Sequence, residues 1–141
     1  GAPVVVHQVP AADGGVLVFG HEHLRTLATP GHTAGCLSFL WRDRLFCGGL
    51  LAVQACPYQP QPALPEALWD SVTRCVFALP DETLLFAGHV QRARAVSTVH
   101  EARLAHPWFA RASRDEFLAR VRAGCAGTRR GATPQATEVR Q

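Results

Sequence analysis

Two histidines stand where a loop could present an imidazole for chemistry. His32 lies in Thr-Pro-Gly-His-Thr at residues 29–33, and His89 ends Ala-Gly-His at residues 87–89. In each case an apolar, strand-like run ends just before the histidine, and a glycine loosens the backbone. The exits of strands are where α/β sheets place functional groups, and imidazole is the commonest side-chain ligand of metals such as zinc and iron. The pattern therefore indicates His32 and His89 as candidate metal ligands.

The first half of the chain predicts a sheet that could hold these loops. Short apolar or β-branched runs, separated by Gly, Pro and Asp, are typical of strands. The turn residues 42–44 (Arg-Asp-Arg) join two of these runs as a hairpin. The expected strands cover residues 4–6, 16–19, 23–29, 35–41 and 45–47, and a later strand covers residues 83–87.

The second half predicts helices. Pro65 suits the first turn of a helix, and apolar residues recur at helical spacing through residue 78. Two more helices are expected at residues 97–105 and 114–123, and the last can be capped by Ser113 with Glu116. The expected fold class is α/β, a mixed sheet with helices on one face.

Length and composition suit one domain with a short extension. The 141 residues are 48% hydrophobic and 18% charged, which is enough apolar material for a core. No window approaches about 18 uninterrupted apolar residues, so no membrane-spanning helix is expected. Within this numbering there is no initiating Met and no basic-then-apolar leader, so we expect a signal peptide either to be absent or to have been removed before this numbering begins. We expect a domain over residues 1–124 and a flexible, Arg-containing tail over residues 125–141.

The charge is distributed unevenly along the chain. All 14 basic residues are Arg; four Arg face seven acids up to Gln91, and ten Arg face four acids from Arg92 onward. Such asymmetry can mark a segment that binds polyanions. The chain lacks aromatic interleaving and a known nucleic-acid motif, which favours solvated helices instead. Neither a nucleic acid nor a membrane is therefore expected as a partner.

The five cysteines follow no metal or redox motif. No C-x-x-C pair exists, which excludes a zinc ribbon and a thioredoxin-like site. Cys36 and Cys47 sit inside apolar runs and are expected to be small buried hydrophobes. This cysteine usage favours a reducing, cytoplasmic location.

Several segments together resemble the metallo-β-lactamase superfamily. Residues 29–39 (Thr-Pro-Gly-His-Thr-Ala-Gly-Cys-Leu-Ser-Phe) and 44–48 (Arg-Leu-Phe-Cys-Gly) are similar to the branch that contains glyoxalase II and persulfide dioxygenases. Further matches lie at residues 79–83, 87–89, 96–99 and 106–117. The resemblance covers about residues 3–122 and implies the C-terminal part of an αββα sandwich.

The resemblance also implies which parts of the family's metal site remain. His32 and His89 match its two lone metal-binding histidines, whereas its Thr-Gly-Asp turn reads Cys-Gly-Gly here, so that Gly49 replaces the bridging carboxylate. Its H-x-H-x-D-H loop is expected upstream of the aligned region, and residues 57–61 match nothing in its glutathione-binding stretch. We therefore expect zinc or iron to be held weakly by His32 and His89 and assign no catalytic residue and no other cofactor.

The remaining histidines are weaker candidates. His21 and His23 lie at i and i+2, which puts two imidazoles on one strand face and could chelate zinc. The resemblance places them in the turn before the His32 strand, away from the site, and we favour an exposed turn. His7, His100 and His106 have no partner pattern and are interpreted as surface or packing residues.

Three functional interpretations follow. The leading one is a truncated, catalytically impaired relative of the glutathione thiolester hydrolases and persulfide dioxygenases. The second is an active metal-dependent enzyme whose H-x-H-x-D-H segment lies upstream or on a partner chain. The third is a noncatalytic interaction module with an Arg-rich helical face. Because apolar runs such as residues 36–41 and 84–87 lack their expected cover, we also expect a homodimer, or a partner that supplies the missing N-terminal half.

Overall fold

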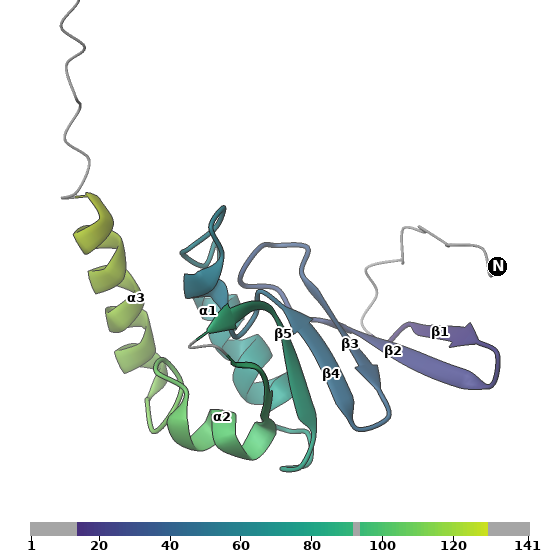
Figure 1. Cartoon of the computed structure of the whole chain (residues 1–141). Coiled ribbons are helices and arrows are strands. Elements are labelled where there is room, and N and C mark those ends of the chain that lie inside the picture. The colour runs from purple at the N-terminus through teal and green to yellow at the C-terminus, as the bar shows by residue number, and fades with distance from the viewer. Residues whose placement is uncertain (1–13, 92–93, 130–141) are drawn as a thin grey trace, which may run out of the picture.

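The computed structural model describes residues 14–91 and 94–129, which form one six-stranded sheet with helices beside it (Figure 1). The strands follow one another across the sheet in chain order, β1-β2-β3-β4-β5-β6. Strands β4 and β5 run parallel, and the other neighbouring pairs are antiparallel. The strands are β1 (Val16–Phe19), β2 (Glu22–Ala28), β3 (Leu37–Trp41), β4 (Arg44–Gly48), β5 (Leu84–Gln91) and β6 (Arg94–Thr98).

The crossover between the parallel strands carries the helix predicted to begin at Pro65. It consists of α1 (Pro65–Asp70) and a wider helical segment, η2 (Ser71–Val76), so the predicted helix over residues 65–78 is confirmed. A short 3₁₀ turn, η1 (Val53–Ala55), precedes it. Two helices follow the sheet: α2 (Val99–Ala105) and α3 (Arg114–Arg129).

Two predicted helix boundaries are wrong. Residues 94–98 form β6, so α2 begins at Val99 and not at residue 97. Its cap is Thr98, whose hydroxyl accepts the Glu101 amide N–H at 3.1 Å while the Glu101 carboxylate accepts the Thr98 N–H at 3.1 Å. Helix α3 continues past Gly124 and Gly127 to residue 129, because each glycine inside a helix costs only about 1 kcal/mol.

The other local predictions fare better. Strand 16–19, the hairpin turn after Trp41 and the Ser113–Glu116 capping box are confirmed. The predicted strand at residues 4–6 lies outside the described residues, and so do residues 130–141 of the predicted tail. Within the described part, no helix is long and apolar enough to cross a bilayer.

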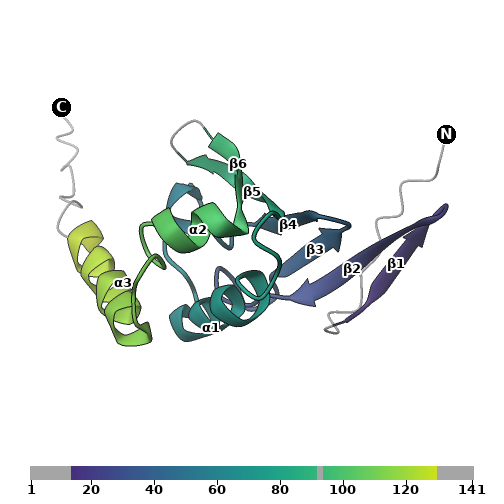
Figure 2. The same cartoon turned by 90° about the horizontal axis from the view of Figure 1, so that it is seen from below.

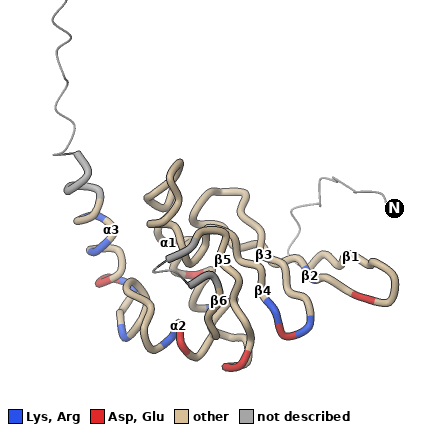
Figure 3. The backbone as a smooth tube through the Cα atoms, in the orientation of Figure 1, with Lys and Arg blue, Asp and Glu red and all other residues tan. Residues whose placement is uncertain are grey.

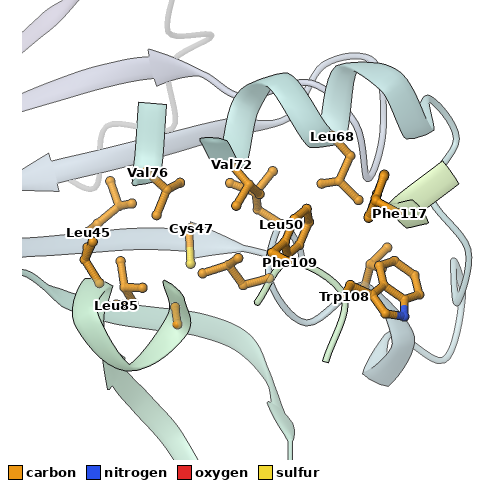
Figure 4. Packing of buried hydrophobic residues seen from close by; sticks show 14 of the residues in the cluster. Leu45, Cys47, Leu50, Leu68, Val72, Val76, Leu85, Trp108, Phe109 and Phe117 are labelled. Atoms are coloured by element: carbon orange, nitrogen blue, oxygen red, sulfur yellow. The ribbon is translucent and has the colours of Figure 1, made fainter. Parts of the chain in front are cut away.

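One face of the sheet carries the core. The register aligns Leu45 of β4 with Leu85 of β5, and both side chains are at most 2% exposed. Figure 4 shows these residues and Cys47 facing Val72 and Val76 of the crossover helix. The aromatic rings of α3 and its preceding loop extend this core. The mixed sheet with helices on one face is therefore confirmed as the fold class.

The opposite face carries a row of apolar residues that are more exposed. Phe39, Phe46, Phe86 and Val96 are successive cross-strand neighbours on β3 to β6. Phe46 stacks on Phe86 with ring centroids 5.1 Å apart, yet Phe46 is 39% and Val96 36% exposed. The helices lie on the other side of the sheet (Figure 2). We call these four residues the open-face row.

Charged residues gather at turns and on the helices (Figure 3). At the β3–β4 turn, Arg42 pairs with Glu22 and Arg44 pairs with Asp43. Arg103 of α2 pairs with Asp81 and also donates to the carbonyls of Phe77 and Leu79, which ties α2 to the loop before β5.

Candidate functional site

The loop that carries His32 is clamped between the sheet and α1. The Thr29 amide N–H donates to the Cys36 carbonyl at 3.0 Å, which closes the loop at its base. The Ser71 hydroxyl donates to the Pro30 carbonyl at 2.7 Å. Gly31 has φ +146°, and a Cβ added to it would lie 2.3 Å from the Leu68 Cα. Glycine is therefore required where α1 meets this loop.

The His32 ring lies over Gly49. A Cβ added to Gly49 would lie 2.6 Å from His32 Nδ1 and 2.7 Å from Cε1, closer than atoms can approach. The imidazole therefore occupies the space into which a side chain at position 49 would project. His32 Nε2 is buried and has no hydrogen-bond partner among the described residues. This leaves one imidazole nitrogen available as a ligand or hydrogen-bonding group.

Cys36 lies beside this imidazole. Its Sγ is 3.7 Å from His32 Nδ1 and 3.0 Å from the Thr33 hydroxyl oxygen, and the Thr33 amide N–H donates to it at 3.4 Å. Cys36 is half-buried, so its prediction as a buried hydrophobe is wrong, since its neighbours are polar. For Cys47 the prediction is confirmed: it is 2% exposed, and burial raises the pKa of its thiol to about 12.

His89 lies on β5, in a different setting. It is half-buried and lines a cleft of about 210 Å³ between the sheet and α2. The preceding Gly88 lies close to β4: a Cβ added to it would lie 3.2 Å from the Gly48 Cα. The β4–β5 register shifts between Phe46 and Gly48. This tight approach explains the glycine before His89.

His106 forms part of the same cleft and is a packing residue, as predicted. Its Nε2–H donates to the Leu51 carbonyl at 2.9 Å, and its Nδ1 accepts the Trp108 amide N–H at 3.2 Å. These bonds fix a neutral tautomer, and burial lowers the pKa of the ring below its ordinary value of 6.5. Its partner Leu51 is distant in sequence, so the residues around His106 do not predict this contact. The end of the preceding helix is the only local feature that indicates a structural role for His106.

The His21–His23 pair is exposed, as predicted. Both imidazoles lie at the surface near the β1–β2 turn. The intervening Glu22 accepts hydrogen bonds from Trp41 Nε1 at 2.9 Å and from Arg42 Nε at 3.0 Å. These donors lower the pKa of the Glu22 carboxyl. The segment thus ties β2 to the β3–β4 hairpin.

The described side chains near His32 and His89 do not provide the ligands that a catalytic metal centre requires. A catalytic zinc keeps three protein ligands and one open position. Across residues 14–91 and 94–129, no group of three or more His, Cys, Asp or Glu side chains is placed to hold one ion. His32 offers a buried nitrogen, but Gly49 offers no carboxylate. The described residues therefore do not fit a three-ligand metal centre.

Solved structures of other proteins share the fold of this chain. No family model matches the chain. In the solved structures, ETHE1 from Myxococcus xanthus matches 79% of the chain with a TM-score of 0.70 and 36% identity, covering 50% of that protein. A metallo-beta-lactamase from Staphylococcus aureus matches 78% of the chain with a TM-score of 0.65 and 23% identity, covering 37% of that protein. The chain therefore has a metallo-β-lactamase fold.

Relatives in sequence define the branch. The mitochondrial persulfide dioxygenase ETHE1 of Bos taurus is 37% identical over 98 residues, which are 67% of this chain and 39% of that protein. A hydroxyacylglutathione hydrolase of a Shewanella strain is 35% identical over 97 residues, 64% of this chain and 36% of that protein. The chain is thus a homologue of persulfide dioxygenases and hydroxyacylglutathione hydrolases. It spans less than half the length of these two relatives, which fits the resemblance to their C-terminal part.

Proposed function

We propose that this chain is a catalytically impaired relative of the persulfide dioxygenases and hydroxyacylglutathione hydrolases. On its own it neither hydrolyses glutathione thiolesters nor oxidises glutathione persulfide. The proposal rests on the homology to persulfide dioxygenases and hydroxyacylglutathione hydrolases together with the local geometry at His32.

The packing of His32 over Gly49 is the observation that carries this proposal. The resemblance assigns a bridging carboxylate to position 49, and the His32 ring fills the space such a side chain needs. A divalent ion held only by imidazole nitrogens from His32 and His89 would be bound weakly. Its bound water would then lack the fixed geometry that metal-ion catalysis requires. The expected zinc or iron thus remains a weakly held ion at most.

The active-enzyme alternative is supported by one observation. His32 Nε2 is buried without a partner, and a buried imidazole nitrogen normally has one. In this second candidate function, an H-x-H-x-D-H segment from upstream sequence or a partner chain completes the ligand set. The Arg-rich interaction module has less support, because α3 mixes Arg114 with Asp115 and Glu116, and Arg120 donates to main-chain carbonyls.

The proposal extends to assembly and location. The open-face row exposes Phe46 and Val96 on a sheet whose other face is packed, which supports association with a second copy of this chain through that face. The four cysteines whose side chains are described carry free thiols, which supports a reducing compartment such as the cytoplasm.

Light scattering after size exclusion tests the association. We expect about twice the 15.2 kDa chain mass at high micromolar concentration. Phe46→Glu places a charge in the middle of the row and should give the monomer mass, whereas Tyr58→Glu, at an exposed loop position, should not. A wild-type monomer at this concentration would contradict the homodimer.

Enzyme assays test the function. The purified chain, supplied with Zn²⁺ or Fe²⁺, is expected to show no turnover of a glutathione thiolester or of glutathione persulfide. Gly49→Asp alone should not restore turnover, because the new side chain collides with the His32 ring. Turnover by the wild-type chain that disappears in His32→Ala would reject the proposal.

A further inference from the structure

The cleft beside His89 is hollow because small side chains line it. A space of about 210 Å³ is surrounded by Ala52, which precedes η1, by Ala87 of β5, and by Ala102 and Ala105 of α2. An alanine has no atoms beyond Cβ, so α2 and β5 meet here without filling the gap between them. Neither His32 nor the loop that holds it contributes to this wall.

The size of the cleft fits a single ring. An engineered apolar cavity of about 150 Å³ binds benzene. A space of about 210 Å³ can therefore hold a six-membered ring with one or two small substituents. The flat faces of such a ring would contact Leu51 and Leu85, which are larger apolar side chains of the wall.

The polar groups of the wall specify one further feature of the ligand. In the part of the chain that the structure describes, neither the His89 ring nor the Ser97 hydroxyl has a hydrogen-bond partner. Each of these groups can donate or accept. The other polar groups are engaged: His106 bonds through both ring nitrogens, and the Cys47 thiol donates to the Phe86 carbonyl.

The apolar character of the wall excludes one class of ligand. A ligand carboxylate placed in this space would lose its hydration. A neutral hydroxyl avoids this cost and can pair with His89 and Ser97.

We propose that this cleft binds a neutral aromatic alcohol of about seven to ten non-hydrogen atoms, sized by the cavity volume. The ring lies against Leu51 and Leu85, and the hydroxyl pairs with Ser97. The site requires no metal and does not depend on the proposed loss of catalysis.

Titration of the ¹⁵N-labelled full chain with p-cresol, followed by NMR, tests the proposal. We expect saturable shifts of residues on α2 and β5 with a dissociation constant of about 1 mM or below. Toluene, which lacks the hydroxyl, should bind about fivefold more weakly, which is the value of one hydrogen bond. Benzoate, which carries a negative charge, should bind at least about tenfold more weakly.

Two variants locate the site. Ala105→Leu fills the cleft from its rim and should weaken p-cresol binding at least about tenfold. Ala119→Leu makes the same change on an exposed position of α3 and should leave binding unchanged. If the NMR spectrum of Ala105→Leu is not that of a folded protein, Ala87→Val, which fills the cleft from β5, is used in its place.

Ser97→Ala tests the polar contact separately. It should bring p-cresol binding close to the toluene value and leave toluene binding unchanged. Any of three results would overturn the proposal: no saturable shift on α2 and β5, benzoate binding as tightly as p-cresol, or undiminished p-cresol binding by the folded cleft-filled variant. None of these results bears on turnover of glutathione substrates, so the proposed function is judged independently.

Discussion

His32 and His89 share a local sequence pattern, a strand followed by Gly-His, and yet the fold gives them different surroundings. His32 lies in a loop held against α1, with its ring over Gly49 and its Nδ1 near Cys36. His89 stays within an extended strand and faces a cleft under α2. The local pattern determines where the backbone turns, at Gly31, and where it approaches a neighbouring strand closely, at Gly88. Residues distant in sequence determine what each imidazole contacts.

The comparison also explains why two matching histidines do not make a metal centre. A metal site needs side chains from several elements to converge on one point. On the His32 side, the resemblance implies a carboxylate at the position of Gly49, and the His32 ring occupies the space that such a side chain would need. The predictions below test each part of this comparison, beginning with the largest expected effect.

Gly31→Ala should destabilise the fold most. The new Cβ would lie 2.3 Å from the Leu68 Cα, and φ +146° is unfavourable for any side chain. Neither backbone can move without opening the contact between the loop and α1, so we expect a loss of at least about 3 kcal/mol. Urea denaturation measures it. Gly35→Ala is the matched control, since an added Cβ there meets nothing within 4 Å, and equal losses for both variants would contradict the clamp.

Gly49→Ala should destabilise by about 1–3 kcal/mol, the usual cost of overpacking, because the methyl group collides with the His32 ring. In a His32→Ala background the same substitution should cost much less. A double-mutant cycle on unfolding free energies isolates this coupling. Additive effects of the two substitutions would show that the ring does not occupy the space over Gly49.

His106 should make stability depend on pH on the His89 side. Burial lowers its pKa in the folded chain, so the unfolded chain binds a proton first as the pH falls below about 6.5. The free energy of unfolding should therefore decrease from pH 7 toward pH 5. His106→Gln should flatten this part of the curve in denaturation experiments. An unchanged slope would mean that His106 titrates normally in the folded chain.

The sequence predicts most of this fold where the signal is local. Strand β1, the β3–β4 hairpin and the helix from Pro65 follow from an apolar run, turn residues and proline placement. Strand β6 is not predicted from the sequence, which places the start of the helix at residue 97, whereas Thr98 is the residue that caps α2. Pairing with β5, which no local pattern encodes, decides the conformation of residues 94–98.

The candidate site is predictable only in part. The identities of His32, Gly49 and His89 are visible in the sequence, and so is the missing carboxylate. The position of the His32 ring over Gly49 is not, because it depends on how two loops meet across the sheet. The hollow beside His89 also arises from alanines on three separate segments.

Metal content tests the central claim most directly. The purified chain is loaded with Zn²⁺ or Fe²⁺, dialysed against a weak chelator and analysed by mass spectrometry, with His32→Ala treated in parallel. Because the described donors do not form a three-ligand centre, we predict far less than one metal ion per chain after dialysis, and the same value for the variant. One tightly held ion per wild-type chain, lost in His32→Ala, would contradict the account.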